Sequence, residues 1–178
     1  MGNQRKIIVR IATSADGFIA RRDGDLEWLT DRPKPKGFYG INEFVRSVDT
    51  NILGRKTYEE GKRLGGNFEP PARYVVFSHG PRPADAPQNV EWVNAPIRPF
   101  AAALRQTPGK NIWLMGGGEL IGAFLDERAI DELVISVMPV FIGDGIPLIA
   151  PRHRHVPLDL LAVEQFDDGV VQLRYRPI

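Results

Sequence analysis

The amino-acid sequence predicts a single α/β domain in which helices flank a mostly parallel β-sheet. Two observations carry this prediction. Short apolar runs rich in β-branched residues alternate with helix-like stretches through the middle of the chain, which is the order of consecutive strand–helix–strand units. Most of the early runs are continuously apolar rather than alternating, as is typical of strands that are buried on both faces.

Each expected element is a segment with one of these two patterns. Expected strands cover residues 6–12, 50–54, 73–78, 90–94, 111–116 and 131–141. Expected helices cover residues 40–48, 57–64, 99–107 and 119–127. A last run, 170–177, alternates apolar and polar residues, which favours a half-exposed antiparallel strand near the edge of the sheet. No composition break divides the chain, so residues 1–178 are expected to form one domain.

Composition narrows the classes of function. The 178 residues carry a net charge of +1, which argues against a broad surface for nucleic acid. The chain has no cysteine, so disulfides, thiolate metal sites and a cysteine nucleophile are excluded. The first apolar run is short and broken by Arg10, and no stretch approaches the roughly 18 apolar residues of a membrane span. We therefore expect a cytoplasmic protein that binds neither nucleic acid nor a membrane.

Three consecutive glycines, Gly116, Gly117 and Gly118, end one expected strand and precede a helix. One interpretation is a tight structural turn. The other is a phosphate site, because a helix N-terminus has unpaired N–H groups and partial positive charge, and glycine lets a phosphate approach the backbone. The triplet is not the G-x-G-x-x-G dinucleotide fingerprint, so by itself it leaves both interpretations open.

A second strand end carries two cations. Gly54 closes a buried run, and Arg55, Lys56 and Thr57 follow at a helix start. We expect Thr57 to be the N-cap, with Glu60 completing a capping box. The helix dipole disfavours cations there, so something anionic is expected to compensate them. Arg55 suits a bidentate phosphate contact, although solvated surface cations are the alternative.

Small and polar residues follow two other strands. Ala12 and Ser14 leave room for a flat ring, whereas Asp16 begins an ordinary turn signal. Ser78 and His79 place a hydroxyl and an imidazole where they suit a phosphate or ribose, or merely form a polar loop. The two remaining histidines stand in a basic loop without an acidic partner, so no metal site is expected.

Taken in order, these segments resemble the dihydrofolate reductase superfamily. The order is S-x-D-G-F-I-A, I-L-G-R-K-T-Y-E, a strand ending in Ser78, G-G-G-E, and then D-E-L-x-I-x-x-x-P-V-x-I-G-D-G-I-P-L. Over about residues 6–177 the chain is most similar to the reductase domain of the riboflavin-biosynthesis deaminase/reductase and its stand-alone relatives. The resemblance implies a central sheet of about eight strands. It also implies NADPH as cofactor and hydride transfer to a small heterocyclic or ribosyl substrate.

The resemblance assigns cofactor-binding roles to residues that match the family's motifs. Arg55 is expected at or near the adenosine 2′-phosphate, and Gly116–Gly117 is expected to be a cis peptide bond. The implied cofactor-binding residues are Ala12, Ile19, Gly54, Arg55, Lys56, Thr57, Ser78, Gly116, Gly117, Gly118, Glu119, Leu120 and Ile121.

The chain departs from the superfamily where the substrate is expected. Dihydrofolate reductases bind the pterin with a helix acid, and aligning the helix through Phe44 puts Gly40 at that position. Riboflavin reductases open with K-x-A-x-S-x-D-G, whose lysine is replaced by Arg10. Candidate substrate-binding residues are Arg10, Ser14, Trp28 and Phe44, and candidate proton donors are Asp16, Glu27 and Glu43.

Two alternatives to the riboflavin-type reductase stay open. One is a reductase of dihydrofolate, another pterin or another carbonyl compound, and the other is a non-catalytic nucleotide-binding protein. Because relatives are commonly homodimers, a homodimer is expected, with residues 170–177 and 133–142 as candidate interface segments. The loop at residues 21–37 is a candidate lid.

Overall fold

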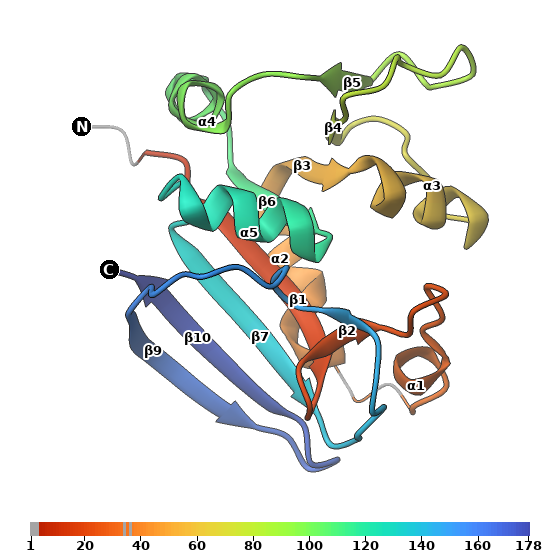
Figure 1. Ribbon diagram of the computed structural model, residues 1–178, viewed down its shortest axis with the longest axis vertical. Helices are drawn as coiled ribbons and strands as arrows, with labels where there is room; N and C mark the ends of the chain where they lie inside the picture. Colours follow the sequence, from red (N-terminus) through yellow and green to blue (C-terminus); the bar gives the residue numbers. More distant parts are fainter. Residues whose placement is uncertain (1–3, 34, 36) are drawn as a thin grey trace.

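The computed structural model describes residues 4–33, 35 and 37–178, and its centre is an eight-stranded sheet (Figure 1). Its strands are β1 (Ile7–Ser14), β3 (Val48–Gly54), β4 (Arg73–Phe77), β5 (Val90–Val93), β6 (Asn111–Gly116), β7 (Glu132–Met138), β9 (Leu158–Gln165) and β10 (Val171–Pro177). They lie side by side in the order β5-β4-β3-β6-β1-β7-β10-β9. A second, two-stranded sheet pairs β2 (Phe18–Ala20) with β8 (Ile146–Pro147).

The predicted, mostly parallel sheet is confirmed, and so is the antiparallel strand expected near its edge at 170–177, which is β10. Six neighbouring strands, from β5 to β7, are parallel, and β10 is antiparallel to both β7 and β9. The edge strand is β9, which the sequence pattern did not predict. The register between β9 and β10 shifts at Arg174/Tyr175. Such a bulge breaks the period of two by which a half-exposed strand is recognised.

Helices cover both faces of the sheet. They are α1 (Glu27–Thr30), α2 (Ile41–Ser47), α3 (Arg55–Arg63), α4 (Ile97–Gln106) and α5 (Gly118–Asp126), with a 3-10 turn η1 (Phe38–Gly40) before α2. On β1, Ile7 and Val9 pack with α4 and α5, whereas Ile8 packs with Phe44 of α2. Successive strand residues point to opposite faces. Helices α4 and α5 therefore cover one face, and α2 covers the other together with α3, whose Tyr58 packs on Leu53.

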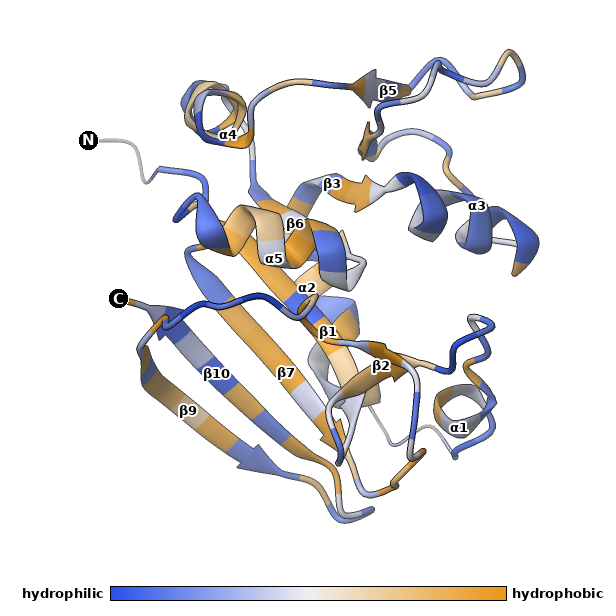
Figure 2. Ribbon diagram, viewed as in Figure 1, coloured by the Kyte–Doolittle hydropathy of each residue, from blue (hydrophilic) through white to orange (hydrophobic). Residues whose placement is uncertain are grey.

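Several expected boundaries move by a few residues. The strand expected at 131–141 ends at Met138, because Pro139 has no N–H for the ladder. Apolar residues follow the central strands β1, β6 and β7 (Figure 2), and the largest apolar cluster packs them against α4 and α5. Among the described residues, no helix is both long enough and apolar enough to cross a membrane.

Candidate active site

Two helix N-termini lie close together at the end of the sheet where the parallel strands have their carboxyl ends. Strands β3 and β6 are parallel neighbours, with Leu53 paired to Gly116. Helix α3 follows β3 directly, and α5 follows β6 after one residue. Ligands of open α/β sheets bind at this end, beyond the carboxyl ends of the strands.

The three glycines after β6 have three different structural settings. Gly116 has a φ of +115°, which favours glycine, and its peptide bond to Gly117 is cis, as expected. A Cβ on Gly118 would lie 2.3 Å from the carbonyl oxygen of Pro147, so glycine is needed there for close packing. Gly117 differs from both, because its φ is −77° and an added Cβ would make only an ordinary contact, 3.4 Å from Thr57 Oγ1.

Gly54 has the same property as Gly117. Its φ is −78°, and an added Cβ would lie 3.8 Å from the Gly116 oxygen and 3.9 Å from the Gly117 nitrogen. We call Gly54 and Gly117 the glycine pair. At neither position does a left-handed φ, or a clash of an added Cβ with a distant part of the chain, require glycine. Their common effect is to leave bare backbone where two helix N-termini converge.

The start of α5 offers backbone donors. Its first internal hydrogen bond runs from the Ile121 N–H to the Gly117 oxygen, 3.0 Å, so earlier N–H groups have no partner inside the helix. Glu119 is exposed and Leu120 half-buried. The side chain of Ile121 is fully buried in the core beneath the turn, so its expected part in cofactor binding would be through the position of the helix start and stays a prediction.

Helix α3 begins differently from the prediction. Its N-cap is Gly54, and no side chain caps it, so Thr57 lies within the first turn and the proposed capping box is wrong. Glu60 pairs with Arg63 instead. The reason is that the strand runs straight into the helix at Gly54, three residues before the hydroxyl that would cap it.

Two cations flank the glycine pair. Arg55 and Lys56 are exposed at the start of α3. Glu59 supplies part of the expected compensation, with its Oε1 2.7 Å from Arg55 Nε. The Arg55 guanidinium extends to the end of β4, where a Cβ on Gly80 would lie 2.7 Å from Nη1 and 3.6 Å from Ser78 Oγ. The ends of β3, β4 and β6 thus bring Arg55, Lys56 and Ser78 to one side of the glycine pair.

His79 lies between Ser78 and Gly80, directly after the end of β4. His79 Nδ1 lies 3.1 Å from Asn94 Oδ1, which ties the end of β4 to the end of β5. Ser78 Oγ accepts the Gly80 N–H at 3.0 Å. Within the described ranges, no group of three or more histidine and acidic side chains is placed to hold a metal ion.

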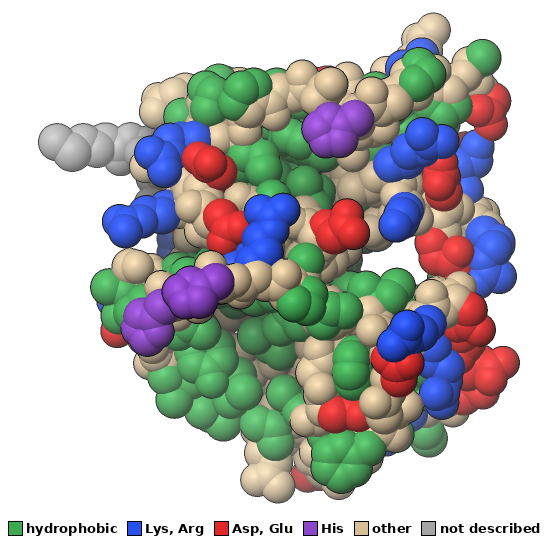
Figure 3. Space-filling view, viewed as in Figure 1, with side chains coloured by type: hydrophobic (Ala, Val, Ile, Leu, Met, Phe, Trp, Pro, Cys, Tyr) green, Lys and Arg blue, Asp and Glu red, His purple; other side chains and the backbone are tan. Residues whose placement is uncertain are grey.

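The surface is hollowed between α3 and the β2–α1 segment (Figure 3). Ile19 of β2 lies on the wall of this hollow, because its Cδ1 would be 3.9 Å from a Cβ on Gly117. At the outer rim, Gly24 lies against Glu60 of α3, with an added Cβ 3.6 Å from the carboxyl carbon. The loop after β2 therefore touches α3 and borders the hollow beside the glycine pair.

A second group of predicted residues lies on the α2 side of β1. Arg10 is half-buried, its Nη2 donates to the carbonyl oxygen of Tyr39, and its Cζ lies 5.1 Å above the Phe44 ring. Burial lowers the pKa of Arg10, and the nearby carboxylates of Glu164 and Glu43 partly oppose that shift. Arg10 and Phe44 are thus brought together, as predicted.

The position expected to carry an acid in folate reductases is bordered by both charges. A Cβ on Gly40 would lie 3.7 Å from Arg10 Nη2 and 3.9 Å from Glu43 Oε2. Trp28 packs with Ala12 and Met138 in a neighbouring apolar cluster. Its buried Nε1 has no hydrogen-bond partner among the described residues.

Ser14 and Asp16 brace the turn between β1 and β2. Ser14 is 1% exposed and its Oγ accepts the Phe18 N–H at 3.0 Å, so the structure gives this hydroxyl a part in the turn, and its expected contact with a substrate stays a prediction. Asp16 accepts the backbone N–H of Gly143 at 2.7 Å and that of Ile142 at 3.2 Å. Hydrogen bonding from Ser14 and from these backbone groups lowers the pKa of Asp16.

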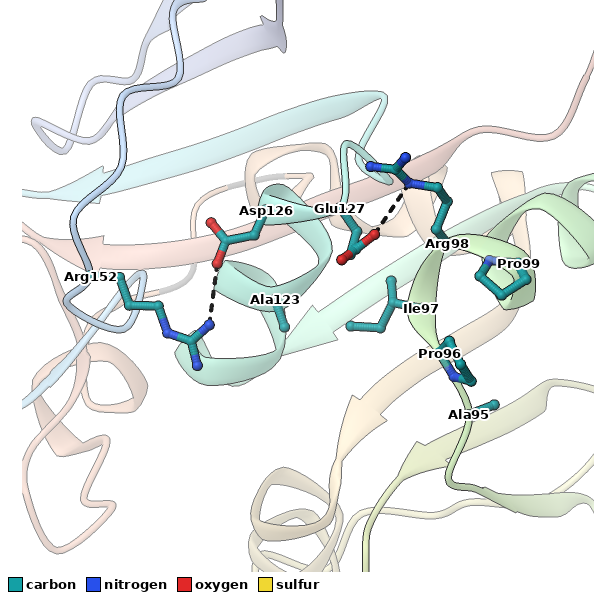
Figure 4. A pocket seen from close by; sticks show the side chains of 9 residues that line it. All are labelled: Ala95, Pro96, Ile97, Arg98, Pro99, Ala123, Asp126, Glu127 and Arg152. Carbon is teal, nitrogen blue, oxygen red and sulfur yellow. Dashed lines mark hydrogen bonds and ion pairs between the residues drawn. The ribbon is translucent and has the colours of Figure 1, made fainter.

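A separate pocket of about 300 Å³ lies between the start of α4 and the last turn of α5 (Figure 4). Two ion pairs line it, Arg98–Glu127 at 3.2 Å and Arg152–Asp126 at 3.5 Å. None of the predicted site residues lines this pocket. The predicted site residues lie instead at the carboxyl ends of β3, β4 and β6 and beside β1.

Sequence reasoning missed Tyr39, whose carbonyl oxygen holds Arg10 and also accepts a 3.5 Å contact from Gln172 Nε2. Tyr39 has a φ of +54°. The available signal was the pair of glycines, Gly37 and Gly40, around two aromatic residues, because such spacing indicates an unusual turn.

Comparison with known proteins places this geometry in a family. The chain is 40% identical over 172 residues to the uncharacterized protein YwjB of Bacillus subtilis, covering 97% of this chain and 98% of that protein. The crystal structure of a candidate riboflavin biosynthesis protein from Shewanella sp. PV-4 superposes with a TM-score of 0.83 at 29% identity, covering 97% of this chain and 99% of that chain.

The fold extends to a folate enzyme. Dihydrofolate reductase from Enterococcus faecalis, in complex with NADP(H) and RAB-propyl, superposes with a TM-score of 0.68 at 19% identity. It covers 98% of this chain and 97% of that chain. The family model of the RibD C-terminal domain matches residues 5–172. This chain therefore belongs to the RibD C-terminal domain family, with the dihydrofolate reductase-like fold.

Proposed function

We propose that this chain is an NADPH-dependent reductase of the riboflavin-biosynthesis type. Its proposed substrate is 5-amino-6-(5-phosphoribosylamino)uracil or a closely related heterocycle. The observation that carries the proposal is the glycine pair, which leaves bare backbone between two helix N-termini although neither a left-handed φ nor a clash with a distant part of the chain requires glycine there.

The residues at the carboxyl ends of β3, β4 and β6 fit a dinucleotide carrying an extra phosphate. Backbone N–H groups at the starts of α3 and α5 suit a pyrophosphate. Arg55, beside Ser78, suits a 2′-phosphate, since its guanidinium can donate two parallel hydrogen bonds. Ile19 would cover the nicotinamide end from β2. When bound, the reduced nicotinamide would supply a hydride to the substrate carbon.

Arg10 and Gly40 favour a substrate rich in hydrogen-bond acceptors over a folate. Arginine can only donate hydrogen bonds. The Arg10 guanidinium lies beside Gly40, which is the position where a folate enzyme would carry an acid. Pyrimidine carbonyls and a phosphate are acceptors, whereas a pterin in folate enzymes presents donors to a carboxylate. We therefore propose that Arg10 binds the substrate directly, with Phe44 beneath its guanidinium.

Of the two candidate proton donors in contact with this region, Glu43 is the better one. The carboxylate of Asp16 is engaged by the backbone of residues 142 and 143, and its lowered pKa keeps it ionised. Glu43 faces the open position at Gly40. We propose that the Glu43 carboxyl group passes a proton to the substrate nitrogen or oxygen when the neighbouring carbon accepts hydride.

The test is NADPH oxidation with the proposed pyrimidine substrate, together with mass analysis of the product. The expected product has gained two hydrogens. Arg10→Ala should raise the KM for the pyrimidine about tenfold or more. It should leave the Kd for NADPH unchanged, and Arg46→Ala, on the exposed side of α2, is the matched control.

The alternatives predict different outcomes. Oxidation with dihydrofolate but not with the pyrimidine would favour the pterin alternative. NADPH binding without oxidation of either compound would favour a non-catalytic nucleotide-binding protein. Failure to bind NADPH would contradict the proposal as a whole.

We propose the cytoplasm as the compartment in which this protein acts.

We further propose that two copies pair through the outward face of β9 and β10. Leu160 and Val163 are 56% and 57% exposed, and they pair with Tyr175 and Leu173, so all four side chains share a face. Figure 3 shows apolar side chains gathered over this part of the sheet. The charged residues of the two strands, Asp159, Glu164, Arg174 and Arg176, point to the opposite face.

A second copy is the occupant that matches this chemistry, because a two-fold axis would place the same apolar face of each copy against the other and bury both from water. Sedimentation should give twice the chain mass of 19.9 kDa. Val163→Glu should give the monomer, whereas Asp159→Lys on the opposite face should not. A monomer at every concentration tested would contradict the pairing.

A further inference from the structure

Residues 37–40, just before α2, have an unusual backbone. Their φ angles are +81°, +46°, +54° and +72°, so four consecutive residues lie in the left-handed region. Two of them, Phe38 and Tyr39, are not glycine, and a side chain makes this region of the backbone unfavourable. A conformation of this kind persists only where surrounding contacts enforce it, and such segments cluster at functional sites.

Contacts with the β9–β10 turn enforce it at Tyr39. The Tyr39 hydroxyl donates to the carboxylate of Asp168, and the Tyr39 ring lies edge-on to Phe166 with centroids 5.0 Å apart. Arg32 joins the same turn, since its Nη2 donates to the Asp168 carbonyl at 3.0 Å and lies 3.6 Å from the Asp168 carboxylate. The hydrogen bond from Tyr39 lowers the pKa of Asp168, which keeps the acceptor ionised.

The other end of Tyr39 reaches the substrate side. Its carbonyl oxygen accepts from Arg10 Nη2 and lies 3.5 Å from Gln172 Nε2, and Gln172 also donates to Ser136 Oγ at 3.0 Å. Within the described residues, the Arg10 guanidinium donates its hydrogen bond to that carbonyl oxygen. A path of direct contacts therefore runs from Asp168 through Tyr39 to Arg10.

We propose that Asp168 and Tyr39 are positioning residues for Arg10, which they hold over Phe44 and beside Gly40 in the orientation that binds substrate. The inference rests on the proposed function, in which Arg10 contacts the substrate. An ordinary structural tie would stabilise the fold and affect both ligands equally. A positioning role changes substrate affinity alone.

The kinetic test uses four variants. Asp168→Ala and Tyr39→Phe each remove the hydroxyl–carboxylate hydrogen bond, and Asp168→Asn keeps an acceptor. Asp159→Ala breaks a comparable ion pair with Arg176, elsewhere on the same hairpin, and is the control. We expect the first two to raise the KM for the pyrimidine about tenfold with kcat and NADPH affinity changed less than about twofold. Asp168→Asn should restore most of the loss.

A double-mutant cycle tests whether the effect passes through Arg10. In an Arg10→Ala background, Asp168→Ala should have no further effect on KM, because there is no guanidinium left to orient. Additive effects, or equal losses of NADPH affinity and substrate affinity, would overturn the proposal.

A readout without turnover separates this inference from the proposed function. The side-chain NMR signal of Arg10 should be sharp and slow to exchange in the wild-type protein and in Asp159→Ala, and broadened in Asp168→Ala and Tyr39→Phe. If the wild-type protein fails to reduce the pyrimidine, the proposed function fails. An Arg10 signal unchanged in both variants would overturn the positioning role, whatever the activity.

Discussion

Gly54 and Gly117 face each other across neighbouring strands, with a Cβ built on Gly54 lying 3.9 Å from the Gly117 nitrogen. Both residues have φ angles near −77°, which any residue adopts, and both have room for a methyl group. Neither the φ angle nor a contact with a distant part of the chain therefore explains glycine at these positions. We propose that the close approach of a phosphate to the backbone explains it.

Gly117→Ala separates a turn from a ligand site. The variant should keep its free energy of unfolding within about 1 kcal/mol of wild type, because the new methyl meets Thr57 Oγ1 at an ordinary 3.4 Å. Its NADPH affinity should fall about tenfold or more, since the methyl stands where the phosphate approaches. Urea denaturation and calorimetric titration check the two halves. Unchanged affinity would return the glycines to a purely structural role.

Gly118→Ala should have the opposite profile and lower stability. Its Cβ would lie 2.3 Å from the Pro147 oxygen, a backbone atom that cannot rotate away. We expect a loss of about 1–3 kcal/mol in the free energy of unfolding, measured by urea denaturation. Gly122→Ala in the same helix is the control, because its nearest neighbours are side-chain atoms of Arg154 and Ile149, at 3.2 Å and 3.3 Å. Equal stability of the two variants would contradict the close packing of β8 on α5.

Arg55→Ala should weaken NADPH binding about tenfold to a hundredfold and leave NADH binding nearly unchanged, because charge-assisted hydrogen bonds to a phosphate are worth about 1.5–3 kcal/mol. Titration with both cofactors measures the ratio. Glu59→Gln is the control, since it frees Arg55 from an exposed ion pair that contributes little. It should leave NADPH affinity the same or tighter. Equal losses for the two cofactors in Arg55→Ala would remove its role at the 2′-phosphate.

Asp16 should make stability depend on acidic pH. Its folded-state pKa is lowered from the ordinary value of 3.8 by hydrogen bonds from Ser14 and from the 142–143 backbone. A lowered pKa means that the contribution is present above the unfolded pKa and is lost as pH falls through the folded one. The melting temperature should therefore fall less steeply below about pH 4 in Asp16→Asn than in wild type, as measured by thermal denaturation. Asp167→Asn, an exposed control, should retain the wild-type slope.

The mostly parallel character of the sheet, the positions of most of its strands and the position of the glycine turn were predictable from the sequence, because they depend on local patterns. Buried strands leave continuous apolar runs, and glycine is rare enough at a strand end to be noticed. The edge strand β9 was not predictable in this way. Its apolar residues face outward, and its bulge removes the alternation that identifies a half-exposed strand.

Residues of the candidate site were predictable where a motif marks them and not where contact is made across the fold. Ser14 was expected to bind a substrate and Asp16 to donate a proton. In the structure Ser14 accepts a hydrogen bond within the turn after β1, and Asp16 accepts one from the loop at 142–143. Tyr39 was missed because its role depends on Asp168, which is 129 positions away in the sequence. Neither relationship leaves a periodic signal in one sequence.

The most direct test of the central claim is an NADPH titration followed by the backbone amide resonances. We predict saturable binding in which the resonances of Gly54, Arg55 and Gly117 move most, together with those at the start of α5. Absence of saturation would contradict it. So would shifts confined to the pocket between α4 and the last turn of α5 (Figure 4), because the nucleotide would then bind away from the glycine pair.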